Sequence, residues 1–128
     1  MISMADYFQG RDVTYAAELT DDLRVNAGEI VDRANELLER FGEDRSVNSG
    51  WRPAAVNAGV PGAALRSKHM TCQAIDLADP EGDLDEWCLD NPHVLAEIGL
   101  WQEHPASTKN WTHVQSIPPK SGNRVFYP

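Results

Sequence analysis

The sequence has few basic residues and no basic cluster. Lysine and arginine account for 11 of its 128 residues, against 20 aspartates and glutamates, so the net charge is −9 with neutral histidines. An acidic surface repels phosphate backbones and other anionic surfaces. The composition therefore argues against nucleic acid as a partner and against tight nonspecific binding to an anionic membrane or cell wall.

Long apolar stretches are also missing. The first residues, MISMADYFQGRD, do not combine a basic start with an apolar run, which is the pattern of a secretory signal. No segment approaches the ~20 consecutive apolar residues that a membrane-spanning helix needs. We therefore expect a protein that is made in the cytoplasm without a signal peptide and has no membrane partner.

Cysteine is scarce, and its two examples are Cys72 and Cys88. Neither belongs to a CxxC pair, so a structural zinc site built from cysteine thiolates is excluded by count. Two half-buried thiols are one interpretation. A single disulfide is the other, although synthesis in the cytoplasm argues against it.

What the sequence does contain is one long helical pattern followed by short strand patterns. Apolar residues recur at helical spacing between a capping Thr20 or Asp21 and a terminating Gly42, which predicts a helix over residues 21–41. Strands are expected near residues 46–52, 73–78, 99–103, 111–116 and 123–127, with a helix over 83–89 and helical turns near 53–59 and 92–97. This order predicts an α+β fold with a small, mainly antiparallel sheet and flanking helices.

The chain shows no repeats and no long linker, so we expect one domain over residues 1–128. Residues 1–20 have no clear pattern and are expected to form an extension that packs on the rest of this domain. The side chains expected to anchor it are Tyr7, Phe8, Tyr15 and Leu19.

Two histidines and an aspartate occupy positions where polar side chains are costly. Asp76 lies between Ile75 and Leu77 in a predicted buried strand, His113 lies in the strand segment WTHVQ, and His69 precedes the Asp76 strand. Two histidine nitrogens and one carboxylate oxygen would leave one tetrahedral zinc position open, as in a catalytic zinc site. The alternative is a pair of satisfied core histidines with Asp76 as a turn or cap residue, because the spacing His69-x6-Asp76 is not specific by itself.

Three blocks resemble the motifs of the zinc D-alanyl-D-alanine carboxypeptidase and endopeptidase family: SGWR at 49–52, SKHMTCQAID at 67–76 and WTHV at 111–114. The family pattern is S-G-aromatic-R, then S-x-H-x-x-G-x-A-x-D, then W-x-H. The resemblance covers about residues 25–128, and it implies the fold shared with lysostaphin-type endopeptidases and the Hedgehog signalling domain. The closing stretch, GLWQEHP…NWTHVQ…PPKSGNRVFYP, is similar to a branch found in phage lysins and phage-associated proteins.

The resemblance implies a role for each matching position. His69, Asp76 and His113 would be the ligands of Zn²⁺. Arg52 would hold a carboxylate or carbonyl of the substrate and steady the oxyanion, and Ser67 would hydrogen-bond the substrate. The alternatives are a surface arginine at a strand end for Arg52 and a loop-turn serine for Ser67.

Two positions depart from the family pattern. The glycine of H-x-x-G is Cys72, which is small but does not adopt glycine-only dihedrals freely. The acid that many members place three residues before the last histidine is Asn110, which cannot take a proton from water. We expect Glu103 to replace it as general base, with His104 as an alternative base or oxyanion stabiliser. The competing interpretation of Glu103 is an exposed charge at a strand end.

The function implied by the resemblance is zinc-dependent hydrolysis of peptide bonds in bacterial peptidoglycan, by a carboxypeptidase or an endopeptidase such as a phage endolysin. The expected partners are peptidoglycan stem peptides, and the expected state is a monomer that reaches the cell wall through another factor or as a phage component. Because Asn110 replaces the acid, the alternative is a structural or phage-assembly module that binds zinc but is inactive.

Three tryptophans flank the proposed site residues and are expected in the core rather than as substrate platforms: Trp51, Trp101 and Trp111.

Overall fold

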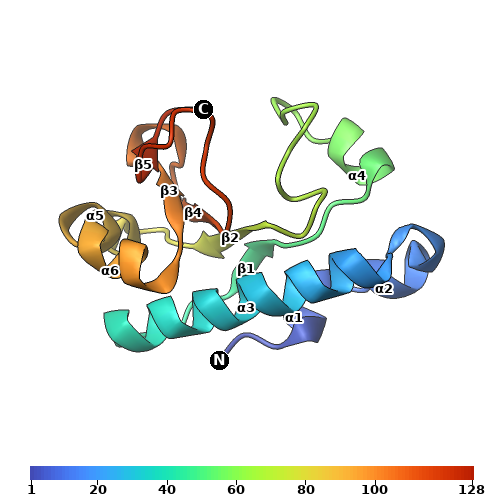
Figure 1. The fold of residues 1–128 in the computed structure, drawn as a ribbon, viewed down its shortest axis with the longest axis horizontal. Helices are drawn as coiled ribbons and strands as arrows, with labels where there is room; N and C mark the ends of the chain where they lie inside the picture. The colour runs from blue at the N-terminus through green and yellow to red at the C-terminus, as the bar shows by residue number, and fades with distance from the viewer.

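The structure, a computed structural model, describes residues 1–128 and contains a five-stranded sheet, one long helix and several short helices (Figure 1). In chain order the elements are α1 (Met4–Phe8), α2 (Arg11–Thr14), the 3₁₀ helix η1 (Ala16–Glu18), α3 (Asp21–Phe41), β1 (Val47–Ser49), α4 (Ala54–Ala58), β2 (Ala74–Ala78), α5 (Asp83–Asp90), α6 (Pro92–Ile98), β3 (Trp101–Glu103), the 3₁₀ helix η2 (Pro105–Ser107), β4 (Trp111–Gln115) and β5 (Val125–Phe126). None of these helices is both long enough and apolar enough to cross a membrane.

Helix α3 begins and ends at the residues that its sequence signals predict. The Oγ1 atom of Thr20 accepts a hydrogen bond from the N–H of Leu23 at 3.2 Å. Gly42 follows the last turn with a φ of 93°, a left-handed conformation that favours glycine. The expected helix over 21–41 is therefore confirmed. Its buried face consists of Ala27, Ile30, Val31, Ala34, Leu37 and Leu38.

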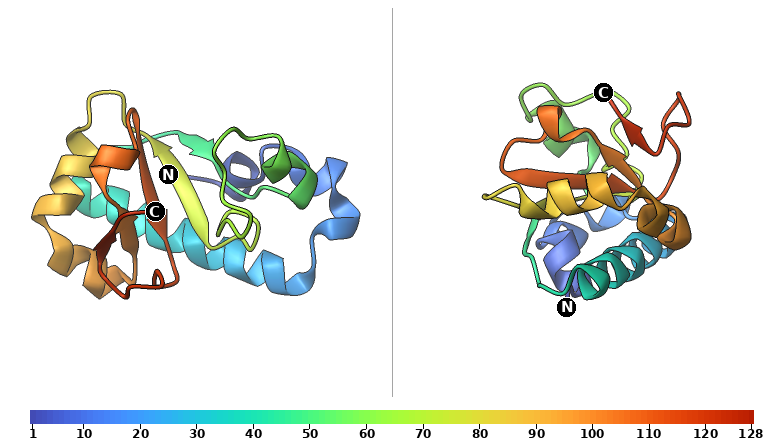
Figure 2. Two further views of the ribbon diagram at one scale, coloured as in Figure 1. Left: turned by 90° about the horizontal axis from the view of Figure 1, so that it is seen from above. Right: turned by 90° about the vertical axis from the view of Figure 1, so that its left-hand side faces the viewer.

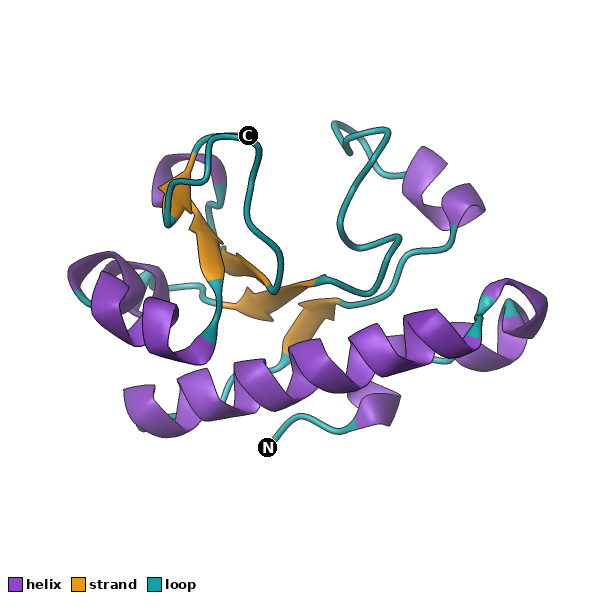
Figure 3. Cartoon of the chain, in the orientation of Figure 1, coloured by secondary structure: helices purple, strands orange, loops and turns teal.

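The strands form one sheet in the order β1-β2-β4-β3-β5. All neighbouring strands are antiparallel except β3 and β5, which run parallel. The expected α+β fold with a mainly antiparallel sheet is confirmed, and the turns expected near 92–97 form the regular helix α6. Figure 3 shows the sheet with α3 running along one side of it.

The central strands direct their apolar residues toward the core and their polar site residues toward the opposite face. Ile75 and Leu77 are fully buried, and Asp76 lies between them on the other face. The register pairs Asp76 with His113 across β2 and β4, and the β3–β4 register continues to place Glu103 opposite His113. Three neighbouring strands therefore contribute Asp76, His113 and Glu103 to one row across the sheet.

Segments on either side of this row rise above the sheet. Helix α4 with the following residues 59–68 forms one of them, and β5 with the C-terminal residues forms the other (Figure 1). Strand β2 remains visible between the two when the molecule is seen from above (Figure 2). The face of the sheet that carries the polar row is thus the face opposite α3.

The N-terminal segment packs closely beside β1 and the start of β2. The hydroxyl of Tyr7 donates to the backbone oxygen of Ala74 at 2.9 Å, and Nη1 of Arg11 donates to the backbone oxygen of Trp51 at 2.8 Å. A Cβ atom on Gly50 would lie 2.0 Å from the backbone oxygen of Tyr7, so this contact requires glycine. Of the expected anchors, three are buried and the last is partly buried: Tyr7, Phe8, Leu19 and Tyr15.

Candidate metal centre

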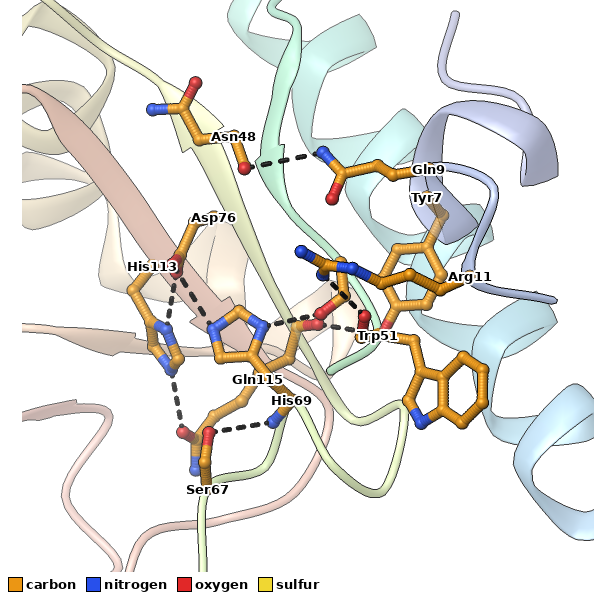
Figure 4. A network of polar contacts seen from close by, with 12 residues as sticks. Tyr7, Gln9, Arg11, Asn48, Trp51, Ser67, His69, Asp76, His113 and Gln115 are labelled. Atoms are coloured by element: carbon orange, nitrogen blue, oxygen red, sulfur yellow. Dashed lines mark hydrogen bonds and ion pairs between the residues drawn. The ribbon is translucent and has the colours of Figure 1, made fainter. Parts of the chain in front are cut away.

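Three side chains that are far apart in the sequence converge on the outer face of the sheet (Figure 4). The Oδ1 atom of Asp76 lies 2.8 Å from Nδ1 of His113, and its Oδ2 atom lies 3.3 Å from Nε2 of His69. One ligand atom from each of the three residues lies within 4.8 Å of the others. The structure therefore brings together the three residues that the sequence motifs single out, in an arrangement that could hold a metal ion.

His69 is held by the backbone of the turn that precedes β2. Its N–H donates to Oγ of Ser67 at 3.2 Å, and its backbone oxygen accepts from the N–H of Arg52 at 3.1 Å. Cys72 bends the chain into β2 with a φ of 57°, which is left-handed and costs a residue with a side chain about 1–2 kcal/mol. This is the position where the motif has glycine, so the backbone geometry explains the motif and cysteine adopts it under strain.

The two histidines present different nitrogens to Asp76. Nδ1 of His69 lies 2.9 Å from the backbone oxygen of Gly50, which can only accept a hydrogen bond, so this nitrogen carries the proton. Nε2 of His69 is then a lone pair that faces a carboxylate oxygen, and it is buried without a hydrogen-bond partner. A cation between these atoms would satisfy both of them, because a lone pair and a carboxylate oxygen that face each other otherwise make an unfavourable contact.

Burial and mutual hydrogen bonds set the charges of the cluster. Burial lowers the pKa of His69, even though Asp76 favours its protonated form. Burial is the largest influence on His113 and opposes its protonation, but the hydrogen bond and charge of Asp76, together with Gln115 and Glu103, outweigh it and raise the pKa. For Asp76, burial favours the protonated form, but the contacts and charges of the two neighbouring histidines together hold the pKa well below the usual range of a carboxyl group. An ionised Asp76 and a neutral His69 are the forms that bind metal.

Arg52 supplies a positive charge beside the cluster. It is 9% exposed, and its Nε atom is buried without a hydrogen-bond partner. Burial lowers the pKa of its guanidinium group, while the charge of Asp76 raises it. The structure thus differs from the surface-arginine interpretation: Arg52 is a buried cation with unused hydrogen-bonding capacity, which suits an anionic group of a bound molecule.

Glu103 lies on the row with the cluster, and His104 turns to other contacts. Glu103 is half-buried, burial raises its pKa, and the charges that act on it include His113 and Asp76. Nδ1 of His104 accepts from the N–H of Ala106 at 3.0 Å, and its ring stacks on Tyr127 at 4.4 Å between centroids. The geometry therefore favours Glu103 over His104 as a base near the metal ligands.

The backbone conformation at position 110 explains why an asparagine is found there. It has a φ of 78°, a conformation that asparagine tolerates better than most residues with side chains. Its backbone oxygen accepts from the N–H of Asp79 at 3.0 Å and so joins the entry of β4 to the exit of β2. Its side chain is exposed.

The cysteines and tryptophans differ in part from expectation. Cys72 and Cys88 are free and fully buried, so the expected half-burial is wrong and the alternative disulfide is not formed. Burial raises the pKa of each thiol to about 12, which removes them as metal ligands at neutral pH. Trp51 is a core residue as expected, whereas Trp101 is partly exposed and lies under the guanidinium group of Arg124 at 4.3 Å.

Two polar groups at the site escaped the sequence motifs. One is the backbone oxygen of Gly50: the residue belongs to the SGWR block, but no side chain signals that its oxygen orients His69. The other is Gln115, whose Oε1 atom lies 3.1 Å from Nε2 of His113. Its spacing of two residues from His113 in a strand did place it on the same face, and that was the available signal.

The sequence matches the Peptidase M15 family over residues 8–115. The chain belongs to this family. The match supports, at family level, a metallopeptidase of the kind that acts on peptidoglycan, and M15 enzymes usually use zinc. It starts earlier than the 25–128 span of the motif resemblance, and so includes part of the N-terminal segment. Searches among curated proteins and among solved structures found no significant match.

Proposed function

We propose that this M15 peptidase is a zinc enzyme that hydrolyses peptide bonds in the stem peptides of bacterial peptidoglycan, as a D-alanyl-D-alanine-type carboxypeptidase or endopeptidase. The observation that carries the proposal is the buried, partnerless Nε2 atom of His69, which faces an ionised Asp76 inside a cluster of two histidines and one carboxylate. A phage endolysin, or an enzyme released to the wall by another factor, is the setting that we infer for a monomeric protein of this kind.

The donor set fits zinc. Two imidazole nitrogens and one carboxylate oxygen are the three protein ligands of several catalytic zinc sites, which keep a further position for water or substrate. The residues that would hold the ion are His69 through Nε2, His113 through Nδ1 and Asp76 through its carboxylate. The chemistry that zinc supplies when bound is polarisation of a carbonyl and acidification of a water molecule near neutral pH.

The remaining steps fall to side chains of this chain. Glu103 accepts the proton that the attacking water loses as its oxygen bonds to the carbonyl carbon. It then gives this proton to the amine nitrogen as the carbon–nitrogen bond breaks, so one water is consumed per bond cleaved. Arg52 balances the negative charge on the former carbonyl oxygen or on a substrate carboxylate, and the hydroxyl of Ser67 can donate to the substrate while it accepts from His69.

A second candidate is a zinc-binding structural or phage-assembly module of the same fold that does not cut. The observation that favours it is Asn110, which stands where many family members have their acid. In this candidate Glu103 has no catalytic role, and its raised pKa reflects burial and the nearby carboxylates of Asp76 and Asp85.

Metal content and wall digestion separate these candidates. Purified wild type supplied with zinc should contain about one zinc per chain, and His113→Ala should contain none. Glu103→Gln should bind zinc normally and lose about 10²–10⁴-fold in the rate of peptidoglycan digestion. Glu86→Gln, which changes an exposed glutamate on α5 away from the site, is the matched control and should keep full activity.

Each outcome decides one point. A wild-type protein that binds no zinc would refute the metal centre. Zinc binding without any digestion by wild type would favour the inactive module, and full activity of Glu103→Gln would assign the base to another group.

A further inference from the structure

The side chain of Gln115 is fixed in one orientation beside His113. It lies two residues after His113 on the same face of β4 and is 4% exposed. Its Nε2 atom lies 2.8 Å from the backbone oxygen of Ile117, which can only accept. The amide nitrogen must therefore face Ile117, and the amide oxygen must face His113.

This orientation has a consequence for the protonation of the His113 ring. Nε2 of His113 lies 3.1 Å from Oε1 of Gln115, an atom without a hydrogen, so Nε2 must carry the proton. Without metal, Nδ1 hydrogen-bonds Oδ1 of Asp76 at 2.8 Å. In the neutral ring that would bind metal, Nδ1 is therefore the nitrogen that offers a free lone pair. His69 uses the opposite arrangement, because the Gly50 oxygen holds its proton on Nδ1.

We propose that Gln115 is a positioning residue that selects the Nδ1-liganding form of His113 and fixes the ring for the metal. This inference rests on the proposed zinc centre. Ligating histidines are commonly oriented by an acceptor on their second nitrogen, and removal of such a partner typically weakens metal binding about 10–100-fold.

The two histidines differ in whether a substitution can change the hydrogen-bond acceptor that orients the ring. The acceptor for His69 is a backbone oxygen, which no substitution removes directly. The acceptor for His113 is a side chain, and a neutral one. A carboxylate at this place would make the ring a stronger donor to the metal, so position 115 is the point where a single substitution can tune the affinity of the centre.

The experiment separates the two hydrogen bonds of Gln115. Gln115→Glu keeps an acceptor for His113 but loses the donor to Ile117, and Gln115→Met loses both while keeping a similar length. The control is Gln73→Met, which removes the amide of a half-buried glutamine outside the site. The Oε1 atom of Gln73 accepts a hydrogen bond from Thr71 rather than from a site residue. Zinc affinity is measured by competition with a chromophoric chelator, with circular dichroism as the check of folding.

We expect Gln115→Met to bind zinc about 10–100-fold more weakly than wild type, and Gln115→Glu and Gln73→Met to bind it at least about as tightly as wild type. The ¹⁵N chemical shifts of His113 in the zinc-loaded wild type should show a protonated Nε2 and a metal-bound Nδ1. If Gln115→Met does not fold, Gln115→Asn serves in its place, because its shorter amide cannot reach both partners, and the same loss is expected.

Three results would overturn the inference. Wild-type affinity in Gln115→Met would show that the acceptor has no role. Equal losses in the Met and Glu variants would assign the effect to the bond with Ile117 instead. A metal bound through Nε2 of His113 would contradict the tautomer. Failure of the proposed function is distinguishable from these, since wild type itself would then bind no zinc.

Discussion

The two faces of β4 carry two polar groups that differ in how far their hydrogen bonds are satisfied. On the outer face, His113 and Asp76 lie beside a histidine nitrogen that has no partner. Toward the interior, Thr112 belongs to a second group, here called the scaffold network. This group contains two carboxylates, Asp79 and Asp85, and each of their oxygens accepts a hydrogen bond. The scaffold network consists of Asp79, Asp85, Gln102, Thr108 and Thr112.

The contacts of the scaffold network are those of a structural brace. Asp79 accepts from two N–H groups at the start of α5, at 2.8 and 3.1 Å, and from the hydroxyl of Thr112 at 3.0 Å. Asp85 accepts from Gln102 at 2.9 Å and from Thr108 at 2.8 Å. The one unpartnered atom of this group is Oε1 of Gln102, which belongs to a neutral amide.

This difference in hydrogen bonding distinguishes a buried carboxylate that binds a ligand from one that only supports the fold. A carboxylate whose oxygens are matched by donors in the protein has nothing left to bind, and its task is to join elements. A carboxylate that faces the lone pair of a buried histidine requires a cation. The scaffold network joins α5, β3 and β4, and so it fixes the strands that carry Glu103 and His113.

The largest expected effects come from making the same change in both groups. Asp76→Asn should weaken zinc binding by more than about 100-fold, beyond the loss typical of an outer partner, and should cost the metal-free protein less stability than Asp79→Asn, because its amide can donate to the lone pair of His69. Asp79→Asn should leave zinc affinity unchanged but lower the free energy of unfolding by about 2–3 kcal/mol, because an amide nitrogen would face buried donors. Chelator competition and urea unfolding give the two readouts. Similar profiles for the two variants would remove the distinction between site and scaffold.

A smaller effect is expected where the N-terminal segment supports the site. Gly50→Ala places a methyl group 2.0 Å from the backbone oxygen of Tyr7, so α1 or the residues around Gly50 must move, at a cost of about 1–3 kcal/mol. The same movement shifts the Gly50 oxygen that orients His69, so zinc affinity should fall as well.

Gly28→Ala is the control for that change. Gly28 lies inside α3 with open space around it, and alanine there should raise stability by about 0.5–1 kcal/mol without altering zinc binding. A stable Gly50→Ala variant with normal zinc affinity would show that the N-terminal segment does not position the site.

The smallest effect concerns the pH dependence of the scaffold network. Burial raises the pKa of Asp85 despite its hydrogen bonds from Gln102 and Thr108. A raised folded-state pKa contributes stability that is present below the unfolded pKa and is lost as the pH rises through the folded value. Asp85→Asn cannot titrate and keeps an oxygen for Gln102, so its Tm relative to wild type should increase as the pH rises from about 3 to about 7. A constant difference in Tm over this range would show that Asp85 does not titrate as inferred.

Regular local signals made much of the fold predictable from the sequence. The helix over 21–41 follows from its apolar spacing, Thr20 and Gly42. The strand of Asp76 follows from Ile75 and Leu77, and the strand of His113 from Trp111 and Val114. The short helices before residue 20 were not predicted, because long-range contacts such as that between Tyr7 and Ala74 hold them in place. The parallel pairing of β5 with β3 likewise depends on partners distant in sequence.

The candidate site was predictable to the extent that side chains identify it. His69, Asp76 and His113 stand out because of the motif blocks, and Glu103 because of its place in a strand. The burial of Arg52 and the engagement of His104 with Tyr127 needed coordinates, since they depend on which face each side chain takes. The SGWR block includes Gly50, but the contact of its backbone oxygen with His69 also needed coordinates.

The row of Asp76, His113 and Glu103 also restricts how this chain can change in length during evolution. Inserting or deleting one residue within β2, β3 or β4 would turn every later side chain of that strand to the opposite face, which would exchange residues of the candidate site for core residues. Residues 60–66 and 118–123 lie outside the strands and can change in length without disturbing the row. Relatives of this protein are therefore expected to vary in the segments that rise above the sheet while the spacing within each of these strands stays fixed.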